Sequence, residues 1–156
     1  MSDNILKAER LYATHAQVIC DNELEKWPEL YTEECRYRLI SRVNYDRNLP
    51  MCVILAESRG ALIDRVTAIR NTLVYAPRYV THLVTNVSIV KQDENLLHTR
   101  SQFVVYFTQT DGNPRVQLVG RSFDQIDTSQ SEWLFAARDA VFDNELVPGS
   151  IVHPIR

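Results

Sequence analysis

The hydrophobic pattern of the sequence changes its period at Pro77, and this change constrains the fold more than any other feature. Before Pro77, apolar residues recur at the spacing of amphipathic helices, and after it they alternate with a period of two, as in strands. Long strands are predicted over residues 79–90, 96–109 and 115–127, and Asp111-Gly112 is a strong signal for a hairpin between the last two. Helices followed by consecutive antiparallel strands indicate an α+β fold.

The part of the chain before the switch is predicted to be mainly helical. A first helix is expected over residues 3–22, with Asp3 or Asn4 accepting backbone N–H bonds at its N-terminus. A short second helix is expected at residues 27–31, and a third over residues 58–73. The apolar face of the third helix is formed by Leu62, Val66, Ile69 and Leu73.

Two further regions complete the predicted fold. Short strands are expected at residues 36–40 and 51–55, on either side of a polar loop. The last segment, residues 131–144, is ambiguous, because its apolar residues suit one face of a helix and one face of a strand equally well. Helices collected on one face of a bent, mainly antiparallel sheet would enclose a cone-shaped core.

Composition and charge exclude several classes of protein. A chain of 156 residues without repeats or linkers is predicted to form a single domain over residues 1–156. The formal net charge of −3 shows no basic excess, so no nucleic-acid partner is expected. There is neither an apolar run of about 20 residues nor a signal-peptide pattern, and three separated cysteines suit a reducing compartment. We therefore expect a cytoplasmic protein that does not contact a membrane.

The histidine spacing argues against a metal centre in this chain. A Rieske cluster needs two cysteines and two histidines in paired close spacings. No cysteine lies two or three residues before any histidine. A non-haem iron site needs two histidines and a carboxylate that converge, and although His82 and His98 could be neighbours across strands, no His-x-x-x-His occurs. We expect no metal ligand, cofactor-binding residue or catalytic residue here.

His82 is the residue that would carry an alternative function. On a regular strand it shares one face with Val80, Val84, Asn86, Ser88 and Val90. Neither face of that strand is plainly the solvent-exposed one. Because a general base also needs a matched partner within reach, a structural, hydrogen-bonded histidine is the favoured interpretation. The alternative is that His82 acts as a general base.

Charged strand residues and the C-terminal tail are candidates for subunit contacts. Asp64 and Arg65 could pair with another subunit, although a solvated pair is the usual case. A charge in a strand must be paired within the chain, paired across an interface or exposed. This applies to Arg100, Arg121, Arg138 and Asp143.

The tail, residues 147–156, is too apolar for a solvated end, and its aliphatic residues include Val147, Ile151 and Ile155. Two arrangements would bury these side chains. The tail could fold back on its own domain, or it could extend as an arm onto a neighbouring subunit. We favour the extended arm.

Several motifs together resemble one known family. They are Glu25-Lys-Trp-Pro-Glu-Leu-Tyr31, Cys35-Arg-Tyr-Arg-Leu39, Leu49-Pro-Met-Cys-Val-Ile-Leu-Ala-Glu-Ser58, Asp64-Arg-Val66, Arg78-Tyr-Val-Thr-His82 and Ala137-Arg-Asp-Ala-Val-Phe-Asp143. Along nearly its whole length the chain is similar to the small (beta) subunits of Rieske-type aromatic-ring-hydroxylating oxygenases. Residues 49–58 look closest to small subunits that act on substituted benzoates such as salicylate or anthranilate.

This resemblance implies both a fold and a function. The fold would be the cone-like α+β fold of nuclear transport factor 2 (cystatin-like), in which residues 131–144 are a strand, because tertiary pairing can override local propensity. The function would be that of a non-catalytic structural subunit in the catabolism of aromatic compounds. Because some relatives of the same cone-like fold are stand-alone isomerases or dehydratases, the alternative that the resemblance implies is an enzyme of that kind with His82 as general base. A large (alpha) subunit would carry the Rieske [2Fe–2S] centre and a mononuclear iron, and small subunits would form the trimeric base of an α3β3 hexamer.

Overall fold

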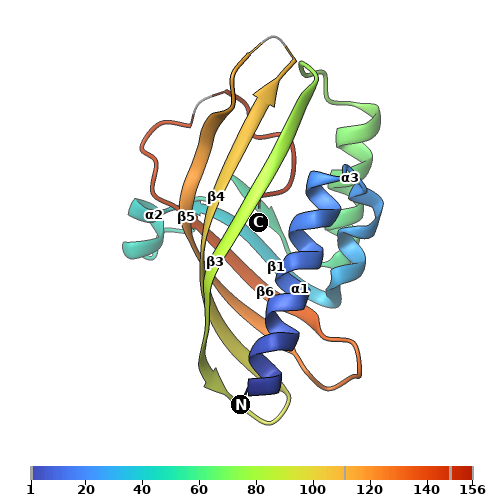
Figure 1. Ribbon diagram of the computed structural model, residues 1–156, viewed down its shortest axis with the longest axis vertical. Helices are drawn as coiled ribbons and strands as arrows, with labels where there is room; N and C mark the ends of the chain where they lie inside the picture. The colour runs from blue at the N-terminus through green and yellow to red at the C-terminus, as the bar shows by residue number, and fades with distance from the viewer. Residues whose placement is uncertain (1, 111, 148, 156) are drawn as a thin grey trace.

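The computed structural model describes residues 2–110, 112–147 and 149–155 and confirms the α+β prediction (Figure 1). Its helices are α1 (Ser2–Cys20), α2 (Arg42–Asp46) and α3 (Arg59–Asn71), with short 3-10 turns η1 (Leu24–Lys26) and η2 (Pro28–Leu30). Its strands are β1 (Tyr31–Ser41), β2 (Ile54–Ala56), β3 (Arg78–Gln92), β4 (Leu96–Gln109), β5 (Arg115–Asp127) and β6 (Leu134–Phe142). No helix in these ranges is long and apolar enough to cross a membrane.

The strands form one sheet in the order β2-β1-β6-β5-β4-β3. Neighbouring strands are antiparallel except for β1 and β6, which are parallel. The sheet curves around α1, and α1 and α3 lie on its concave side, so that buried side chains of both helices and of the strands share one core (Figure 1).

The three long strands agree closely with their predicted ranges. β4 and β5 begin and end at the predicted residues, and β3 is longer than predicted by one residue at its start and two at its end. β4 and β5 pair as the predicted hairpin, in which the Gly112 N–H donates to the Gln109 carbonyl at 3.1 Å; residue 111 lies outside the described residues. β6 confirms the strand at the end of the chain. It lies between β1 and β5, where backbone pairing on both sides outweighs its local helical propensity.

β3 does not keep one face inward along its whole length. Up to Thr85 the even-numbered positions point inward, and Val80 and His82 are buried. A register shift between Thr85 and Ser88, with Asn86 at a φ of 55°, marks a bulge. Beyond it Val87 and Ile89 pack on the core. The predicted continuation of the His82 face through Asn86, Ser88 and Val90 is therefore wrong, because one extra residue moves every following side chain to the opposite face.

Several predicted helix boundaries are also wrong. α1 begins at Ser2, so Asp3 and Asn4 lie inside its first turn and do not cap it. Residues 27–31 contain a single 3-10 turn and not an α-helix. α3 ends at Asn71, which leaves Leu73 outside the helix and 43% exposed.

The region between the two short strands differs from its prediction as well. The polar loop contains α2, whose N-cap Ser41 accepts the Asn44 N–H at 3.4 Å. The second short strand is only Ile54–Ala56, at one edge of the sheet, where it pairs with β1.

Candidate functional site

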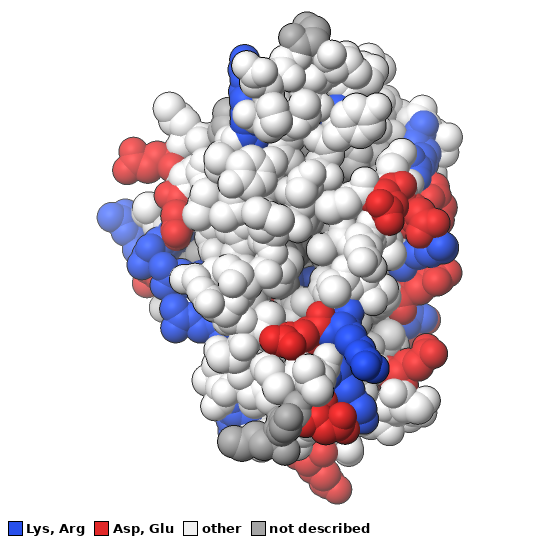
Figure 2. All heavy atoms as spheres, viewed as in Figure 1, with Lys and Arg blue, Asp and Glu red and all other residues white. Residues whose placement is uncertain are grey.

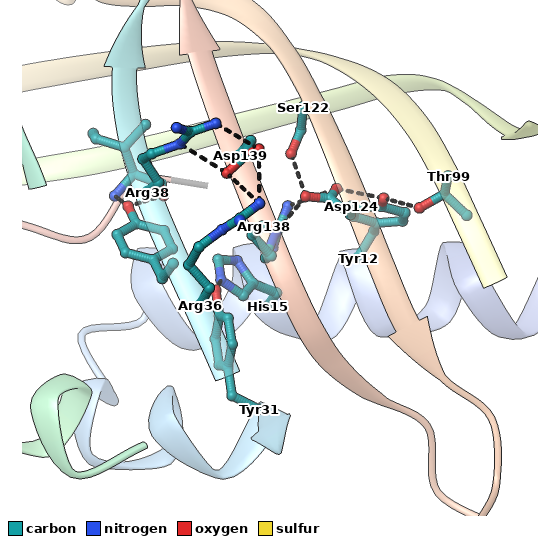
Figure 3. Close-up of polar contacts among 12 residues, drawn as sticks. Tyr12, His15, Tyr31, Arg36, Arg38, Thr99, Ser122, Asp124, Arg138 and Asp139 are labelled. Carbon is teal, nitrogen blue, oxygen red and sulfur yellow. Dashed lines mark hydrogen bonds and ion pairs between the residues drawn. The ribbon is translucent and has the colours of Figure 1, made fainter. Parts of the chain in front are cut away.

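A buried polar cluster lies inside the cone and is centred on Asp124 (Figure 3). We call it the Asp124 cluster; it consists of Tyr12, Thr99, Ser122, Asp124 and Arg138. The strand register places Thr99 of β4, Asp124 of β5 and Arg138 of β6 side by side in one cross-strand row. Tyr12 reaches the row from α1, so the cluster joins the helix to three strands.

The Asp124 carboxylate accepts four hydrogen bonds in the cluster. The Tyr12 hydroxyl donates at 2.5 Å and the Ser122 hydroxyl at 2.6 Å, while Nε and Nη2 of Arg138 donate at 3.2 and 3.4 Å. The Arg138 side chain is completely buried, and its guanidinium lies 4.1 Å from the centre of the Phe135 ring. The paired charges and the aromatic face compensate for the loss of water.

The electrostatics of the cluster keep both Tyr12 and Arg138 protonated. Burial and the negative charge of Asp124 raise the pKa of Tyr12 far above its ordinary value, so the phenol stays neutral and donates. Burial opposes the charged form of Arg138, but attraction to Asp124 prevails and raises its pKa, so the guanidinium stays charged. With its oxygens occupied by these donors, Asp124 is suited to stabilising the fold rather than to accepting a substrate proton.

His15 belongs to the aromatic core beside this cluster. The Trp27 indole N–H donates to its Nε2 at 2.9 Å, and the Tyr31 hydroxyl lies 3.0 Å from the same nitrogen. Its ring also packs edge-on against Phe135, with 5.6 Å between the ring centres. His15 therefore connects α1 to the start of β1.

His82 lies at the border between α1 and β3. It is 6% exposed, and its backbone N–H donates to Cys20 Sγ at 3.3 Å. Its side chain lines a groove of about 540 Å³ between the two elements, together with Tyr12 and Glu9. Glu9 is the one carboxylate among the described residues of this groove, and it is exposed.

His82 and His98 lie at different places along the β3–β4 pair. His82 pairs with Val105, whereas His98 pairs with Lys91 near the other end of β3 and contacts Asp93 at 3.2 Å. The prediction that they could be adjacent is therefore wrong. Within the described part of the chain, no group of three or more His, Cys, Asp or Glu side chains could hold a metal ion.

A second charged cluster lies on the opposite face of the sheet. Asp139 follows Arg138 in β6 and therefore points to the convex side. It accepts from Nη2 of Arg36 at 3.1 Å and from Nε and Nη2 of Arg38 at 3.0 and 2.9 Å. In the neighbouring strand β5, Phe123 lies beside Asp139. The Phe123 ring stacks on the Tyr45 ring, with 5.2 Å between the ring centres.

The structure places the charged interface candidates in different environments. Arg138 is buried and paired with Asp124, so the choice left open by the sequence is decided in favour of an intrachain pair, and Arg138 is wrong as an interface residue. Asp143 lies just after β6 and pairs with Arg42 at 3.4 Å. Asp64 and Arg100 are exposed and Arg121 is half-buried, so their role in a subunit contact stays a prediction.

The C-terminal tail folds back on its own domain, so the favoured prediction of an extended arm is wrong. Ile155 is 1% exposed, and its backbone N–H and carbonyl both bond the buried Tyr37 hydroxyl. Nη2 of Arg65 donates to the Val152 carbonyl at 3.1 Å. Val147 and Ile151 are partly buried against the same core, and residues 148 and 156 lie outside the described residues. The tail finds enough apolar surface within its own chain.

Comparison with known proteins decides the family. The model of the ring hydroxylating beta subunit family matches residues 14–149. The chain belongs to this family. Among related sequences of beta subunits, it is 29% identical over 136 residues to the anthranilate 1,2-dioxygenase small subunit of Burkholderia cepacia, covering 86% of this chain and 84% of the relative. It is 24% identical to a terephthalate 1,2-dioxygenase beta subunit of a Comamonas species, covering 97% and 99% of the two chains.

Solved structures agree with the beta-subunit fold. A protein of Novosphingobium aromaticivorans, assigned as the beta subunit of an aromatic-ring-hydroxylating dioxygenase, superposes with a TM-score of 0.91 at 27% identity, covering 99% and 98% of the two chains. A protein of the same organism, assigned as a scytalone dehydratase, superposes with a TM-score of 0.74 at 18% identity, covering 98% and 95%. At that identity the second likeness shows the fold alone.

Sequence reasoning missed most of the Asp124 cluster in this beta subunit. One signal was available, because Arg138 and Asp139 are adjacent in a strand and one of the two charges must point inward. The partners Tyr12 and Asp124 are 112 residues apart, and only the fold brings them together.

Proposed function

We propose that this chain is the structural small subunit of a multicomponent aromatic-ring-hydroxylating oxygenase. The observation that carries the proposal is the family match over residues 14–149, most of the chain. The interior of the cone supports it, because the polar side chains of the Asp124 cluster there already bind one another.

The oxygen chemistry would then belong to a partner. In this proposal a large subunit carries the Rieske [2Fe–2S] centre and the mononuclear iron, and this chain supports its assembly in the cytoplasm. A Rieske centre requires cysteine and histidine ligands, and the described residues of this chain bring no such set together. The substrate class would be substituted benzoates, since the relatives named above act on anthranilate and terephthalate, which are both carboxylated aromatic rings.

The surface offers a face suited to such an assembly. Figure 2 shows charged side chains mainly along the sides and lower end of this view, while its centre, over β3 and the border with α1, is mostly uncharged. Exposed residues of β3 include Tyr79 at 72%, Leu83 at 51% and Val90 at 67%. Patches of this kind are typical of protein contacts. A trimeric base of an α3β3 hexamer would bury two different patches of each protomer.

The test is to express the chain alone and together with a candidate large subunit. We expect the chain alone to contain no stoichiometric iron and to show no turnover, and we expect the complex to consume oxygen with anthranilate or terephthalate. Stoichiometric iron in the chain alone, or isomerase or dehydratase turnover by it, would overturn the proposal.

His82→Ala tests the alternative enzyme directly. If His82 is structural, turnover per iron in the assembled complex stays within a few-fold of the unmodified complex, as it should in the surface control His98→Ala. Removal of a general base instead lowers turnover by about 100-fold or more. That loss, in a complex of unchanged mass and iron content, would favour the alternative.

A further inference from the structure

A second cavity lies where the end of α1, the start of β3 and the C-terminal tail meet. Its volume is about 340 Å³, and the lining side chains include Ile19, Asn22, Tyr75, Arg78, Tyr79 and His153. We propose that this cavity binds a small aromatic carboxylate, with Arg78 and His153 contacting the carboxylate group and the Tyr75 ring contacting the aromatic ring.

Arg78 provides a positive charge that no described carboxylate neutralises. Its Nε donates to the Ala76 carbonyl at 3.2 Å and its Nη1 to the Ser150 carbonyl at 3.0 Å. The guanidinium also lies 5.7 Å from the centre of the Tyr75 ring. These contacts hold the group in position, and within the described residues its Nη2 makes no hydrogen bond. A positioned guanidinium favours a carboxylate, which can accept from it with good geometry.

His153 provides a second polar group at the same cavity. It is 7% exposed, and within the described ranges its ring nitrogens have no hydrogen-bond partner, although its ring packs edge-on against Tyr75 at 5.7 Å. Burial, reinforced by the positive charges of Arg78, Arg70 and Arg65, lowers the pKa of His153 to about 4. The imidazole is therefore neutral at physiological pH and has an N–H to donate, and the charges around it favour an anion.

The other residues that line the cavity favour an aromatic ring in the ligand. Tyr75, Ile19 and Val80 present aromatic and aliphatic surface that a bound ring would cover. Acetate would contact Arg78 and His153 but not the apolar walls, and benzamide would contact the apolar walls without bringing a negative charge to Arg78. Benzoate offers both groups, and this defines the ligand class.

The first experiment compares three ligands on the purified full-length chain by calorimetry and by proton NMR. We expect saturable binding of benzoate with a Kd of about 1 mM or tighter, which is ordinary for a ligand of this size. Benzamide and acetate should each bind at least about tenfold more weakly, because each lacks one of the two contacts. The absence of saturable benzoate binding, or equal binding of either comparison ligand, would overturn the proposal.

Variants then locate the site. Arg78→Met should weaken benzoate binding at least about tenfold. The matched control is Arg100→Met, which removes an arginine that lies 5.8 Å from the Phe123 ring, outside the cavity, and should leave binding unchanged. Equal losses in both variants would refute the assignment.

A spectroscopic measurement on the unmodified chain covers the case in which Arg78→Met does not fold. The imidazole resonances of His153, assigned by comparison with His153→Gln, should shift as benzoate saturates the site, whereas those of His98 should stay constant. Saturation without a His153 shift would place the ligand elsewhere. None of these results depends on the oxygenase role, because the chain is studied alone and no turnover is measured.

Discussion

Breaking the buried Asp124–Arg138 pair from one side should destabilise the fold strongly. In Arg138→Met the Asp124 charge stays buried, and among the described side chains the Tyr12 and Ser122 hydroxyls remain as its donors. Removing one member of a buried pair typically costs about 3–5 kcal/mol. For a domain of this length a change of 1 kcal/mol moves Tm by about 2–4 °C, so a fall in Tm of roughly 6–20 °C is expected.

The double variant Asp124→Asn/Arg138→Met tests the physical reason. The amide introduced by Asp124→Asn would keep hydrogen bonding with Tyr12 and Ser122 but bring no charge into the core, so the double variant should be more stable than the sum of the single effects predicts. We expect a coupling of at least about 2 kcal/mol in the double-mutant cycle.

The assay is urea unfolding followed by the fluorescence of Trp27 and Trp133 at one fixed protein concentration. Arg36→Met is the matched control, because Asp139 keeps Arg38 as its partner and the Arg36 side chain is 48% exposed; its cost should stay below about 1 kcal/mol. Single-variant effects below about 1 kcal/mol, or additive effects in the cycle, would refute the argument.

The remaining predictions concern His153 and two glycines. Folding lowers the pKa of His153 from 6.5 to about 4. Between these two values the unfolded state binds a proton that the folded state does not, so the free energy of unfolding is highest above pH 6.5 and decreases as the pH falls toward 4. The total decrease is about 3 kcal/mol. His153→Gln should flatten urea stability measured between pH 6.5 and 4.5, and an unchanged slope would contradict this. Gly120→Ala should destabilise by about 1–3 kcal/mol or more in the same assay, because the new Cβ would overlap the backbone carbonyl oxygen of Val141 and lie 2.8 Å from Phe142 Cα. Gly60→Ala in α3, with 3.7 Å to Ser58 Oγ, should be neutral or stabilising by up to about 1 kcal/mol, and equal losses in the two variants would be evidence against the steric argument.

The sequence by itself determined those features that depend on local periodicity. The alternation of apolar residues placed β4 and β5 correctly to the residue, and the turn signal joined them as a hairpin. The helical spacing located α1 and α3, because the burial of one helix face repeats every three or four residues whatever lies opposite. The family motifs added the final strand, which local propensity left undecided.

The candidate site consists of residues that lie far apart in the sequence, so no local sequence pattern predicts their contacts. Because Arg138 and Asp139 are adjacent in a strand, one of their two charges must face the core. The register of β5 and β6 determines that this residue is Arg138 and that it pairs with Asp124. The bulge at Asn86 decided which residues of β3 point inward beyond Thr85.

The C-terminal tail shows the same limit. Its apolar residues required burial, and the sequence could not say against which surface. The tertiary structure supplied the Tyr37 hydroxyl and the Arg65 guanidinium as partners for the backbone of the tail. Burial of apolar area is non-directional, so the sequence determines that such a segment must be covered, whereas only the packed fold determines what covers it.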